Sequence, residues 1–497
     1  MTQAPARIVI VGGGTAGWLA ALMLADQARR AGQAGEITVV ESSRIGTIGV
    51  GEGTTAVFRQ MLQHLGIDEM AFLRETGATV KYGIRHRDWR RVGHSYDGPI
   101  DDIAQVAGPG LDTYAVASGR SVAEAHLFTH LMARRRAPFG ERDGRRVAAG
   151  PFHFAYHFDQ ARAGAFLKRH APGVRCIDDQ VKGVETGEDG IKSLTLESGQ
   201  RLSADLYVDC TGFARALIGP LGAQWIGFGD VLPVNRAMPF WIDLAEGEEI
   251  DPVTLAWAQG AGWMWKIPTQ ERYGCGYVYS DAHTTPEAAQ AEIEAVLGHR
   301  IEPRRDIRIN AGRLDRAWIG NCVALGLSSS FLEPLEATSI HGTIVQLMLL
   351  TGLPEAGRAA AYNAAVARQV DDFRDFIRMH YVSERRDTPF WRDVAASHPP
   401  AVTDRLAQWA EAMPQRRDFT PFPLGLPHVE QQLYTPVLDG LGLLSQRAAK
   451  AALANDPRRR AALRRTHGAL VSEYRRAAGK CLPHRPFLQS LQEDFAI

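Results

Sequence analysis

Cysteine is scarce in this chain, and none of its cysteines forms a C-x-x-C pair. The five residues are Cys176, Cys210, Cys275, Cys322 and Cys481. A scattered, odd-numbered set excludes a cysteine-based zinc motif and is typical of a reducing compartment rather than of a disulfide framework. The sequence accordingly predicts no metal site.

An excess of charge of one sign is also missing, because 56 basic residues balance 56 acidic ones. This balance argues against nucleic acid or an anionic membrane as the main partner. One basic cluster, Arg458–Arg460 with Arg464 and Arg465, is expected to form the solvated face of a helix. No apolar run reaches the roughly eighteen residues that a membrane span needs, and no signal peptide precedes Arg7. We therefore expect a soluble cytoplasmic protein.

The chain opens with a pattern typical of a βαβ unit. Arg7–Val11 is a short β-branched run, a glycine-rich turn follows, and Trp18 to about Arg30 is an apolar helix. The turn consists of Gly12, Gly13, Gly14, Thr15, Ala16 and Gly17. In a G-x-G-x-x-G turn the first glycine permits the tight bend, the second lets the backbone approach a pyrophosphate, and the third lets the helix pack on the strand. The free N–H groups of the helix N-terminus then face the phosphates.

Glu36–Val40 is predicted to be the second strand, and Glu41 follows it. An acid about two dozen residues after the last glycine accepts a hydrogen bond from a ribose hydroxyl, so Glu41 indicates an adenosine ribose without a 2′-phosphate. The strands on both sides of the turn favour dinucleotide binding over the alternative, a plain glycine-rich turn.

The next segments predict a loop, two helices and a strand. Thr47–Thr55 is too rich in glycine for a strand and is expected to be a loop close to the cofactor. Ala56–Leu65 and Asp68–Glu75 are predicted to be short helices. Thr79–Trp89 alternates as a single strand, and on that pattern alone Lys81 is an exposed strand lysine.

The middle of the chain is predicted to be mostly strands. Residues 97–146 are polar and irregular and are expected to form an insertion. Strands are expected near Gly173–Val184, Lys192–Glu197 and Leu206–Val208, and an antiparallel sheet at about 235–280. In that sheet the period-two pattern places Trp263, Trp265 and Ile267 on one face, and Pro268 ends the ladder. Such a face is usually plain core; a cavity wall is the alternative.

Towards the C-terminus the pattern becomes helical. Asn321–Leu327 is predicted to be a buried strand and Ile340–Leu350 a helix. Thr338 and Ser339 then stand at the helix N-terminus, which can hold an anion through backbone N–H groups. From Arg358 onward the chain is expected to form a helical C-terminal module.

Together these motifs resemble the flavin-dependent tryptophan halogenase family over nearly the whole chain. The matching segments are Gly49–Glu52, Lys81–Arg85, Asp209–Phe213, Trp263–Pro268, Pro334–Thr338, His380–Tyr381 and Arg385–Trp391. The resemblance implies an α/β (α+β) fold like that of flavin monooxygenases. Residues 1–350 would form the FAD-binding module with its inserted antiparallel sheet, and residues 351–497 a helical substrate module packed against it.

The resemblance also implies a chemistry and its residues. FAD, used as FADH2 with O2, would oxidise chloride or bromide to hypohalous acid, which halogenates an electron-rich ring of the indole or tryptophan type. Lys81 would hydrogen-bond the hypohalous acid or carry the halogen as a haloamine, with Glu336 close by. Thr338 and Ser339 would hold halide, while Trp263, Trp265, Ile267 and Pro268 would separate flavin from substrate. The implied flavin contacts are Gly12, Gly14, Thr15, Ala16, Gly17, Glu41, Val50, Gly51, Val181, Leu327 and Ile340.

Three features depart from the family's tryptophan-specific members. Those members usually read Glu-Ser-Thr-Gly where this chain has Glu336-Ala337-Thr338-Ser339. They carry an aromatic-His-Pro loop after the lysine strand, whereas Ser95–Pro99 contains no histidine. The C-terminal aromatic cluster that grips free tryptophan has no match. The substrate and the choice between chloride and bromide therefore stay open.

Two other functions stay open as well: an FAD-dependent aromatic monooxygenase that hydroxylates its substrate, and a non-catalytic flavin-binding scaffold. A hydroxylase has no use for Lys81 or the tryptophan wall, and the pairing of Lys81 with Glu336 speaks against a scaffold. One dinucleotide loop and no second one for NADH predict a separate NADH-dependent flavin reductase as a partner. The oligomeric state is open, with a homodimer as one option.

Overall fold

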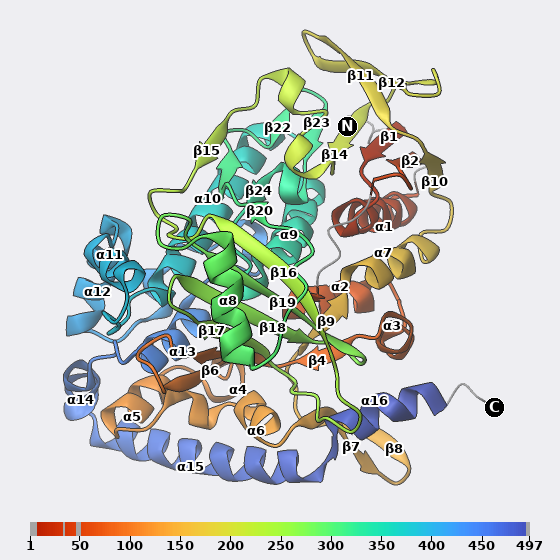
Figure 1. Ribbon diagram of the computed structural model, residues 1–497. Coiled ribbons are helices and arrows are strands. Elements are labelled where there is room, and N and C mark those ends of the chain that lie inside the picture. Colours follow the sequence, from red (N-terminus) through yellow and green to blue (C-terminus); the bar gives the residue numbers. More distant parts are fainter. Residues whose placement is uncertain (1–6, 33–34, 46–50, 494–497) are drawn as a thin grey trace.

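A six-stranded sheet with the order β10-β2-β1-β14-β23-β22 lies in the upper right part of the view in Figure 1. The computed structural model describes residues 7–32, 35–45 and 51–493. The strands are β10 Arg175–Asp178, β2 Glu36–Glu41, β1 Arg7–Val11, β14 Leu206–Asp209, β23 Cys322–Ala324 and β22 Trp318–Ile319. From β10 to β23 all neighbours are parallel, and β22 joins antiparallel. The predicted α/β class is confirmed.

The opening βαβ unit forms as predicted. Helix α1 (Thr15–Arg30) starts three residues before the expected Trp18 and packs on β1 and β2. Gly12 has φ +114°, and a Cβ there would lie 2.2 Å from the carbonyl oxygen of Cys210. A Cβ at Gly17 would lie 1.8 Å from the carbonyl oxygen of Gly12. Only glycine therefore fits these two positions of the turn.

A seven-stranded sheet with the order β20-β16-β19-β18-β17-β5-β6 lies beside the first sheet. Its strands are β20 Ile307–Arg308, β16 Arg236–Asp243, β19 Arg272–Tyr279, β18 Gly262–Pro268, β17 Thr254–Ala258, β5 Gly83–Arg87 and β6 Ser95–Pro99. The predicted antiparallel sheet at about 235–280 is confirmed, and it is extended by β5, which runs parallel to β17.

The prediction of one strand over Thr79–Trp89 is wrong. The chain changes sheets at Tyr82, whose N–H donates to the carbonyl oxygen of Pro252 and whose carbonyl oxygen accepts from Ile100. Strand β4 (Thr79–Lys81) therefore belongs to a small sheet with the order β3-β9-β4, while the following residues form β5. Strand β9 spans Ala155–Asp159.

The predicted glycine-rich loop over Thr47–Thr55 is wrong at Gly51–Gly53, which forms strand β3 and pairs with β9, while Thr54 and Thr55 lie outside any helix or strand. Glycine allows an unusually close approach here: a Cβ at Gly274 of β19 would lie 2.5 Å from the Cα of Gly51. Residues 46–50, including the predicted flavin contact Val50, lie outside the described residues.

Residues 97–146, expected to be irregular, contain regular elements. They are the end of β6, α4 Ala104–Ala107, α5 Leu111–Ala117, the 3₁₀ turn η1 Val122–Ala125, α6 Leu127–Ala133, β7 Arg136–Arg142 and the start of β8 Arg145–Ala148. Helix α15 (Pro457–Lys480) packs along α5 and α6, and β25 (Cys481–Pro483) pairs with β7 (Figure 1). This segment thus joins the C-terminal helices in one layer.

The remaining elements surround these sheets. The other helices are α2 Ala56–His64, α3 Glu69–Thr76, α7 Gln160–Arg169, α8 Pro286–Leu297, α9 Thr338–Gly352, α10 Arg358–His380, α11 Pro389–Ala396, α12 Pro400–Glu411, α13 Gln431–Leu441, α14 Gln446–Ala454 and α16 His484–Glu493. The other strands are β11 Val181–Gly187, β12 Gly190–Leu196, β13 Arg201–Leu202, β15 Trp225–Gly227, β21 Gly312–Leu314 and β24 Ser330–Phe331. The two helices predicted after residue 55 and the helical C-terminal region are confirmed.

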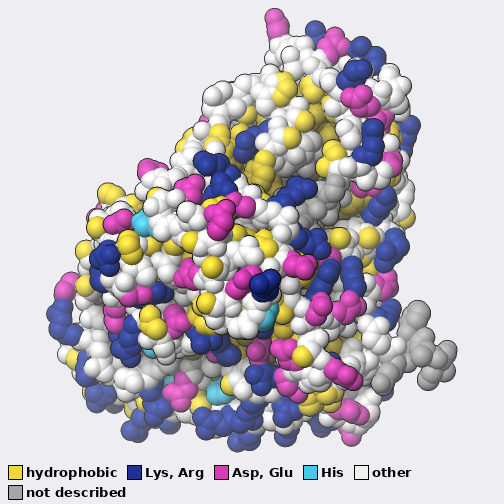
Figure 2. All heavy atoms as spheres, in the orientation of Figure 1, with side chains coloured by type: hydrophobic (Ala, Val, Ile, Leu, Met, Phe, Trp, Pro, Cys, Tyr) yellow, Lys and Arg dark blue, Asp and Glu magenta, His cyan; other side chains and the backbone are white. Residues whose placement is uncertain are grey.

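The basic cluster lies on the solvated face of α15, as predicted. Arg458–Arg460, Arg464 and Arg465 are all exposed, and Lys and Arg side chains line the lower edge of the molecule where α15 runs (Figure 2). No helix among the described residues is both long and apolar enough to span a membrane.

Candidate active site

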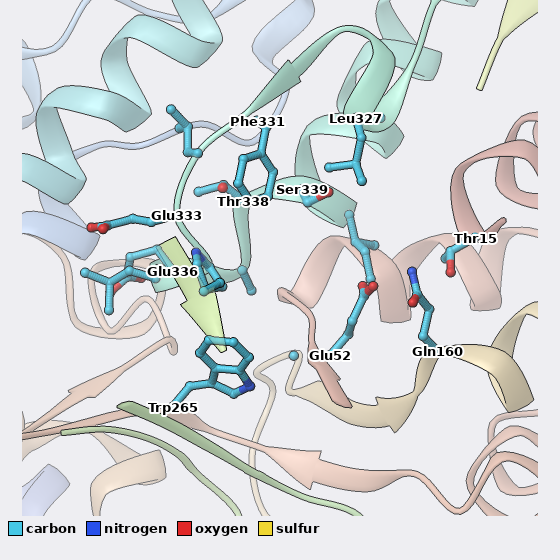
Figure 3. Close-up of a pocket in the computed structure, with 18 of the residues that line it drawn as sticks. Thr15, Glu52, Gln160, Trp265, Leu327, Phe331, Glu333, Glu336, Thr338 and Ser339 are labelled. Atoms are coloured by element: carbon cyan, nitrogen blue, oxygen red, sulfur yellow. The ribbon is translucent and has the colours of Figure 1, made fainter. Parts of the chain in front are cut away.

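A cavity of about 280 Å³ extends from the N-terminus of α1 to Lys81 and Glu336. In Figure 3, Thr15 and Gln160 lie at one side, Glu336 lies at the other, and Trp265 lies between them. Most of the lining is apolar, and four of its ionisable side chains come from distant segments of the chain. Lys81 and Glu333 are buried, whereas Glu52 and Glu336 are partly buried.

The end of the cavity at α1 is suited to the phosphate groups of a dinucleotide. No side chain caps α1 at Gly14, so the first N–H groups of the helix are left for a ligand. A Cβ at Gly14 would meet nothing within 4 Å, which leaves open space beside the turn. Among the described residues, Thr15 Oγ1 and Gln160 Oε1 are buried without a hydrogen-bond partner, and both residues line the cavity. The helix N–H groups and the Thr15 hydroxyl are donors and fit the pyrophosphate of FAD, whereas Gln160 Oε1 is an acceptor and suits a hydroxyl group of the cofactor.

The predicted flavin contacts divide into three groups. Gly14, Thr15, Ala16, Gly51, Leu327 and Ile340 line the cavity. Gly12 and Gly17 shape the turn, and Glu41 accepts a hydrogen bond from Trp18 Nε1 at 3.1 Å and pairs with Lys168. Val181 begins β11 and is not among the described residues that line the cavity.

Lys81 is buried, contrary to the expectation from the strand pattern alone. It ends β4, is 2% exposed, and lines the cavity. Gly53 makes room for it, since a Cβ there would lie 3.1 Å from Lys81 Nζ. Burial lowers the pKa of Lys81 to about 8, and the negative charge of Glu336 opposes this shift. About a tenth of the amine is therefore uncharged at pH 7.

Glu336 and Ala337 have left-handed backbone conformations, with φ of +70° and +54°. Two consecutive non-glycine residues in this region are strained, and such strain concentrates at functional sites. The turn starts α9 at Thr338, where no side chain caps the helix, so the N–H groups near Thr338 and Ser339 face the cavity without a side-chain acceptor. Nothing in the sequence pattern predicted the strained conformation.

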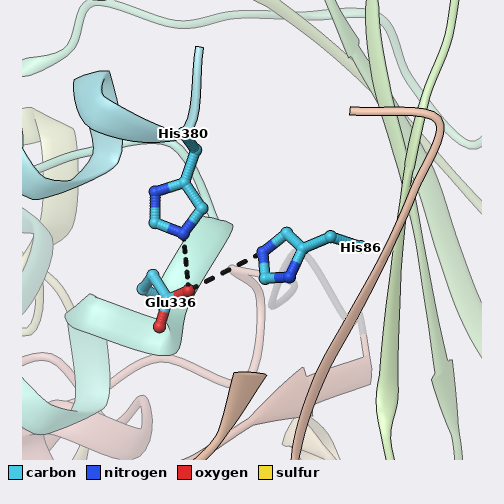
Figure 4. Close-up of side chains that lie close together, drawn as sticks. All are labelled: His86, Glu336 and His380. Atoms are coloured by element: carbon cyan, nitrogen blue, oxygen red, sulfur yellow. Dashed lines mark hydrogen bonds and ion pairs between the residues drawn. The ribbon is translucent and has the colours of Figure 1, made fainter. Parts of the chain in front are cut away.

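Two histidines that sequence reasoning left without a role lie against Glu336 (Figure 4). His380 Nε2 is 3.0 Å from Glu336 Oε1, and His86 Nε2 is 3.9 Å from the same oxygen. Both imidazoles are fully buried. The sequence predicted no metal site, yet one ligand-type atom from each of these three residues lies within 4.8 Å of the others. The His380-Tyr381 motif was the available signal for this cluster.

Three of the four residues predicted to form a wall between flavin and substrate line the cavity. Trp263 and Trp265 are 1% and 6% exposed, their ring centroids are 6.3 Å apart, and both line the cavity together with Ile267. A Cβ at Gly276 would lie 2.0 Å from Trp265 Cη2, so the indole lies directly over that glycine of β19. Pro268 ends β18 and is not among the described lining residues.

Two further acids in the cavity were not predicted as site residues. Burial raises the pKa of Glu52 to about 7. Burial also raises the pKa of Glu333 to about 8, although the Tyr381 hydroxyl donates to Glu333 Oε2 at 2.8 Å. The cavity therefore carries less negative charge near neutral pH than its side chains suggest.

Known proteins match this chain over nearly its full length. The family model for tryptophan halogenase matches residues 7–456. Tryptophan 6-halogenase SttH of Streptomyces toxytricini is 34% identical over 493 residues, which cover 92% of this chain and 93% of that protein. The structure of Tar14, a tryptophan C-6 flavin-dependent halogenase from taromycin biosynthesis, has a TM-score of 0.88 at 31% identity and covers 98% of this chain and 99% of its own. BrvH, a flavin-dependent halogenase from Brevundimonas sp. BAL3, has a TM-score of 0.85 at 32% identity, with coverage of 98% and 99%.

Proposed function

This chain belongs to the tryptophan halogenase family, and from that premise we propose that it is a halogenase acting on an electron-rich aromatic ring of the indole or tryptophan type. The family implies FAD and a halide, and we propose that FAD is used as FADH2 with O2. The bound flavin would supply the oxidising power that converts halide into hypohalous acid. The uncapped N-terminus of α1, with Thr15 and Gln160, would hold the FAD.

Lys81 would carry the halogen from the flavin side to the ring. Its uncharged Nζ attacks the halogen of hypohalous acid, the oxygen–halogen bond breaks, and water leaves with one amine proton. The ring then takes the halogen from the haloamine, and the ring proton returns through Glu336 to Nζ. Of the two roles that the sequence left open, the pKa of about 8 favours this one, because a hydrogen-bond donor does not need an uncharged amine.

The halide would bind at the N-terminus of α9. Backbone N–H groups near Thr338 and Ser339 face the cavity, and no side chain caps this helix. Because Ser339 stands where tryptophan-specific members have glycine and because bromide is easier to oxidise than chloride, we propose that bromide is accepted more readily.

The observation that carries the proposal is the shared cavity. Lys81 and Glu336 line the same cavity as the uncapped end of α1, and Trp263 and Trp265 lie in its wall. This arrangement suits a freely moving oxidant that reaches a buried amine. Direct oxygen transfer from flavin to substrate, which a hydroxylase needs, would be blocked by the two indoles.

We propose that indole or a similar small ring is used at least as well as free tryptophan. The zwitterion of tryptophan needs partners for both of its charges, because burying either unpaired is costly. Among the described lining residues, the cationic side chains are Lys81 and Arg308, and Arg308 lies within 3.5 Å of Asp281. The aromatic C-terminal residues Trp409, Phe419 and Tyr434 pack on one another outside the cavity lining.

We further propose that FADH2 comes from a separate NADH-dependent flavin reductase, since the chain has one dinucleotide turn. Sedimentation measures the assembly, for which a homodimer is one option.

One experiment tests the function. Purified protein is mixed with a flavin reductase, FAD, NADH, bromide or chloride, and equal amounts of indole and tryptophan, and products are counted by mass spectrometry. A scavenger of free hypohalous acid is included, so that only enzyme-bound halogen reaches the ring. We expect monohalogenated indole in at least the yield of halogenated tryptophan. Hydroxylated products alone would support a monooxygenase, and flavin binding without product would support a scaffold.

A further inference from the structure

The contact between His380 and Glu336 contains one proton more than a neutral histidine and a carboxylate can provide. His380 Nδ1 lies 2.9 Å from the carbonyl oxygen of Phe376, and His380 Nε2 lies 3.0 Å from Glu336 Oε1. A carbonyl oxygen only accepts, so Nδ1 must carry a hydrogen. An ionised carboxylate also only accepts, so Nε2 must carry a second hydrogen unless the carboxyl itself is protonated.

The other groups that face Glu336 do not supply this proton. Burial and the nearby charge of His380 lower the pKa of His86, whose ring stacks on Tyr96 with a centroid distance of 4.6 Å and whose nitrogens have no partner among the described residues. Burial raises the pKa of Tyr96, and the charge of Glu336 adds to that shift. His86 and Tyr96 are therefore neutral, which leaves His380 and Lys81 as the cationic partners of Glu336.

His380 and Lys81 compete for the negative charge of Glu336. A negative Glu336 raises the pKa of Lys81 and so holds a proton on the amine. A proton on His380 Nε2 neutralises Glu336 through a charge-assisted hydrogen bond and removes that effect. We propose that His380 is a positioning residue that keeps an imidazolium on Glu336, so that Lys81 can stay uncharged. The proposal rests on the proposed function only in the use of that amine; the charge arrangement itself can be measured without turnover.

The test measures the protonation of Lys81. FAD-loaded protein without substrate is treated with a trace of acetic anhydride, a small neutral reagent that acylates uncharged amines, from pH 6 to pH 10, and labelling of the Lys81 peptide is followed by mass spectrometry. We expect a midpoint near pH 8 in the unaltered protein. His380→Gln keeps a donor for Glu336 but no charge, so the midpoint should rise by about one pH unit and labelling at pH 7 should slow by about tenfold.

Two controls separate this effect from a structural one. His428→Gln alters another buried imidazole that pairs with a carboxylate of α10, Asp372, at 2.7 Å, and it should leave the Lys81 midpoint unchanged. In a Glu336→Gln background, His380→Gln should no longer shift the Lys81 midpoint. The negative charge of Glu336, which the loss of the imidazolium would otherwise leave unneutralised, is already absent.

Three results would overturn the proposal. One is an unchanged Lys81 midpoint in a folded His380→Gln variant. The second is a Glu336→Gln midpoint that falls by about one pH unit, because a Glu336 that the imidazolium already neutralises should not raise the pKa of Lys81; this remains measurable even when His380→Gln does not fold. The third is one equivalent of zinc in the purified protein that is lost with His380→Gln, since a metal ion would then occupy the place of the proton. Loss of halogenation with the expected labelling shifts would instead count against the proposed function and leave the charge arrangement standing.

Discussion

The two ends of the cavity are built in different ways. At the flavin end, backbone groups from one continuous segment, the turn before α1, face the cavity, and a short glycine pattern is enough to specify them. At the lysine end, ionisable side chains from β4, the turn before α9 and the end of α10 meet in a buried space. Backbone N–H groups do not titrate, so a binding site made from them works at any pH. A reactive amine must be uncharged, and its pKa depends on burial and on the charges of its neighbours.

The largest expected effect separates the two ends directly. Lys81→Ala should reduce halogenation by on the order of 10³-fold, a typical loss for a group that takes part in the chemistry. Reoxidation of bound FADH2 by O2 should continue, because the flavin end is untouched. Both rates are measured in one reaction, with product counted by mass and flavin followed by absorbance. If Lys81→Ala halogenates at the rate of the unaltered protein with a scavenger present, Lys81 does not carry the halogen to the ring.

The end of the cavity at α1 should bind FAD in preference to NADP. A carboxylate at Glu41 repels the 2′-phosphate of NADP, so the protein should bind FAD and show no measurable NADP binding. Equilibrium dialysis with each ligand measures this preference. Glu41→Gln removes the carboxylate and should reduce the preference for FAD over NADP. Binding of NADP without binding of FAD would contradict the dinucleotide assignment.

The lysine end should respond to pH, and the sign follows from the pKa of Lys81. Because burial lowers that pKa to about 8, the uncharged fraction rises about tenfold per pH unit below 8 and levels off above it. The halogenation rate per flavin oxidised should follow the same curve from pH 6 to pH 9. A rate that falls above pH 8 would mean that the ammonium form acts, as a hydrogen-bond donor to hypohalous acid.

The smallest effect concerns stability at the lysine end. The folded protein holds the pKa of Glu333 at about 8 by burial, above the 4.5 of an unperturbed glutamate, so the folded state binds more protons between these values. Stability should therefore fall as pH rises from about 5 to 8. In Glu333→Gln this part of the fall should vanish, which corresponds to a few degrees in melting temperature at pH 8 relative to pH 5. If the melting temperatures of the two proteins change with pH in the same way from pH 5 to pH 8, Glu333 is ionised over this whole range and the prediction is wrong.

Local patterns predicted the secondary structure at the N-terminus of α1 and at the start of α9 well. The βαβ unit, the glycine turn and the start of α9 near Thr338 depend on residues close in sequence, so strand alternation, helix periodicity and glycine geometry were sufficient. The predictions failed where a segment joined a distant partner. Gly51–Gly53 became a strand because β9 and Gly274 receive it, and Thr79–Trp89 divided because Pro252 and Ile100 bind Tyr82.

The sequence by itself, through its resemblance to a known family, predicted which residues could do the chemistry: a lysine in a strand, a glutamate before a helix, two tryptophans on one face, and a phosphate-binding turn. Only the tertiary structure decided their states. Burial made Lys81 a weak base, the turn gave Glu336 a left-handed backbone, and the end of α10 brought His380 to within 3.0 Å of a carboxylate 44 residues away in the chain. The reason is that the charge on a side chain depends on its solvation and on the charges around it, and folding alone determines both.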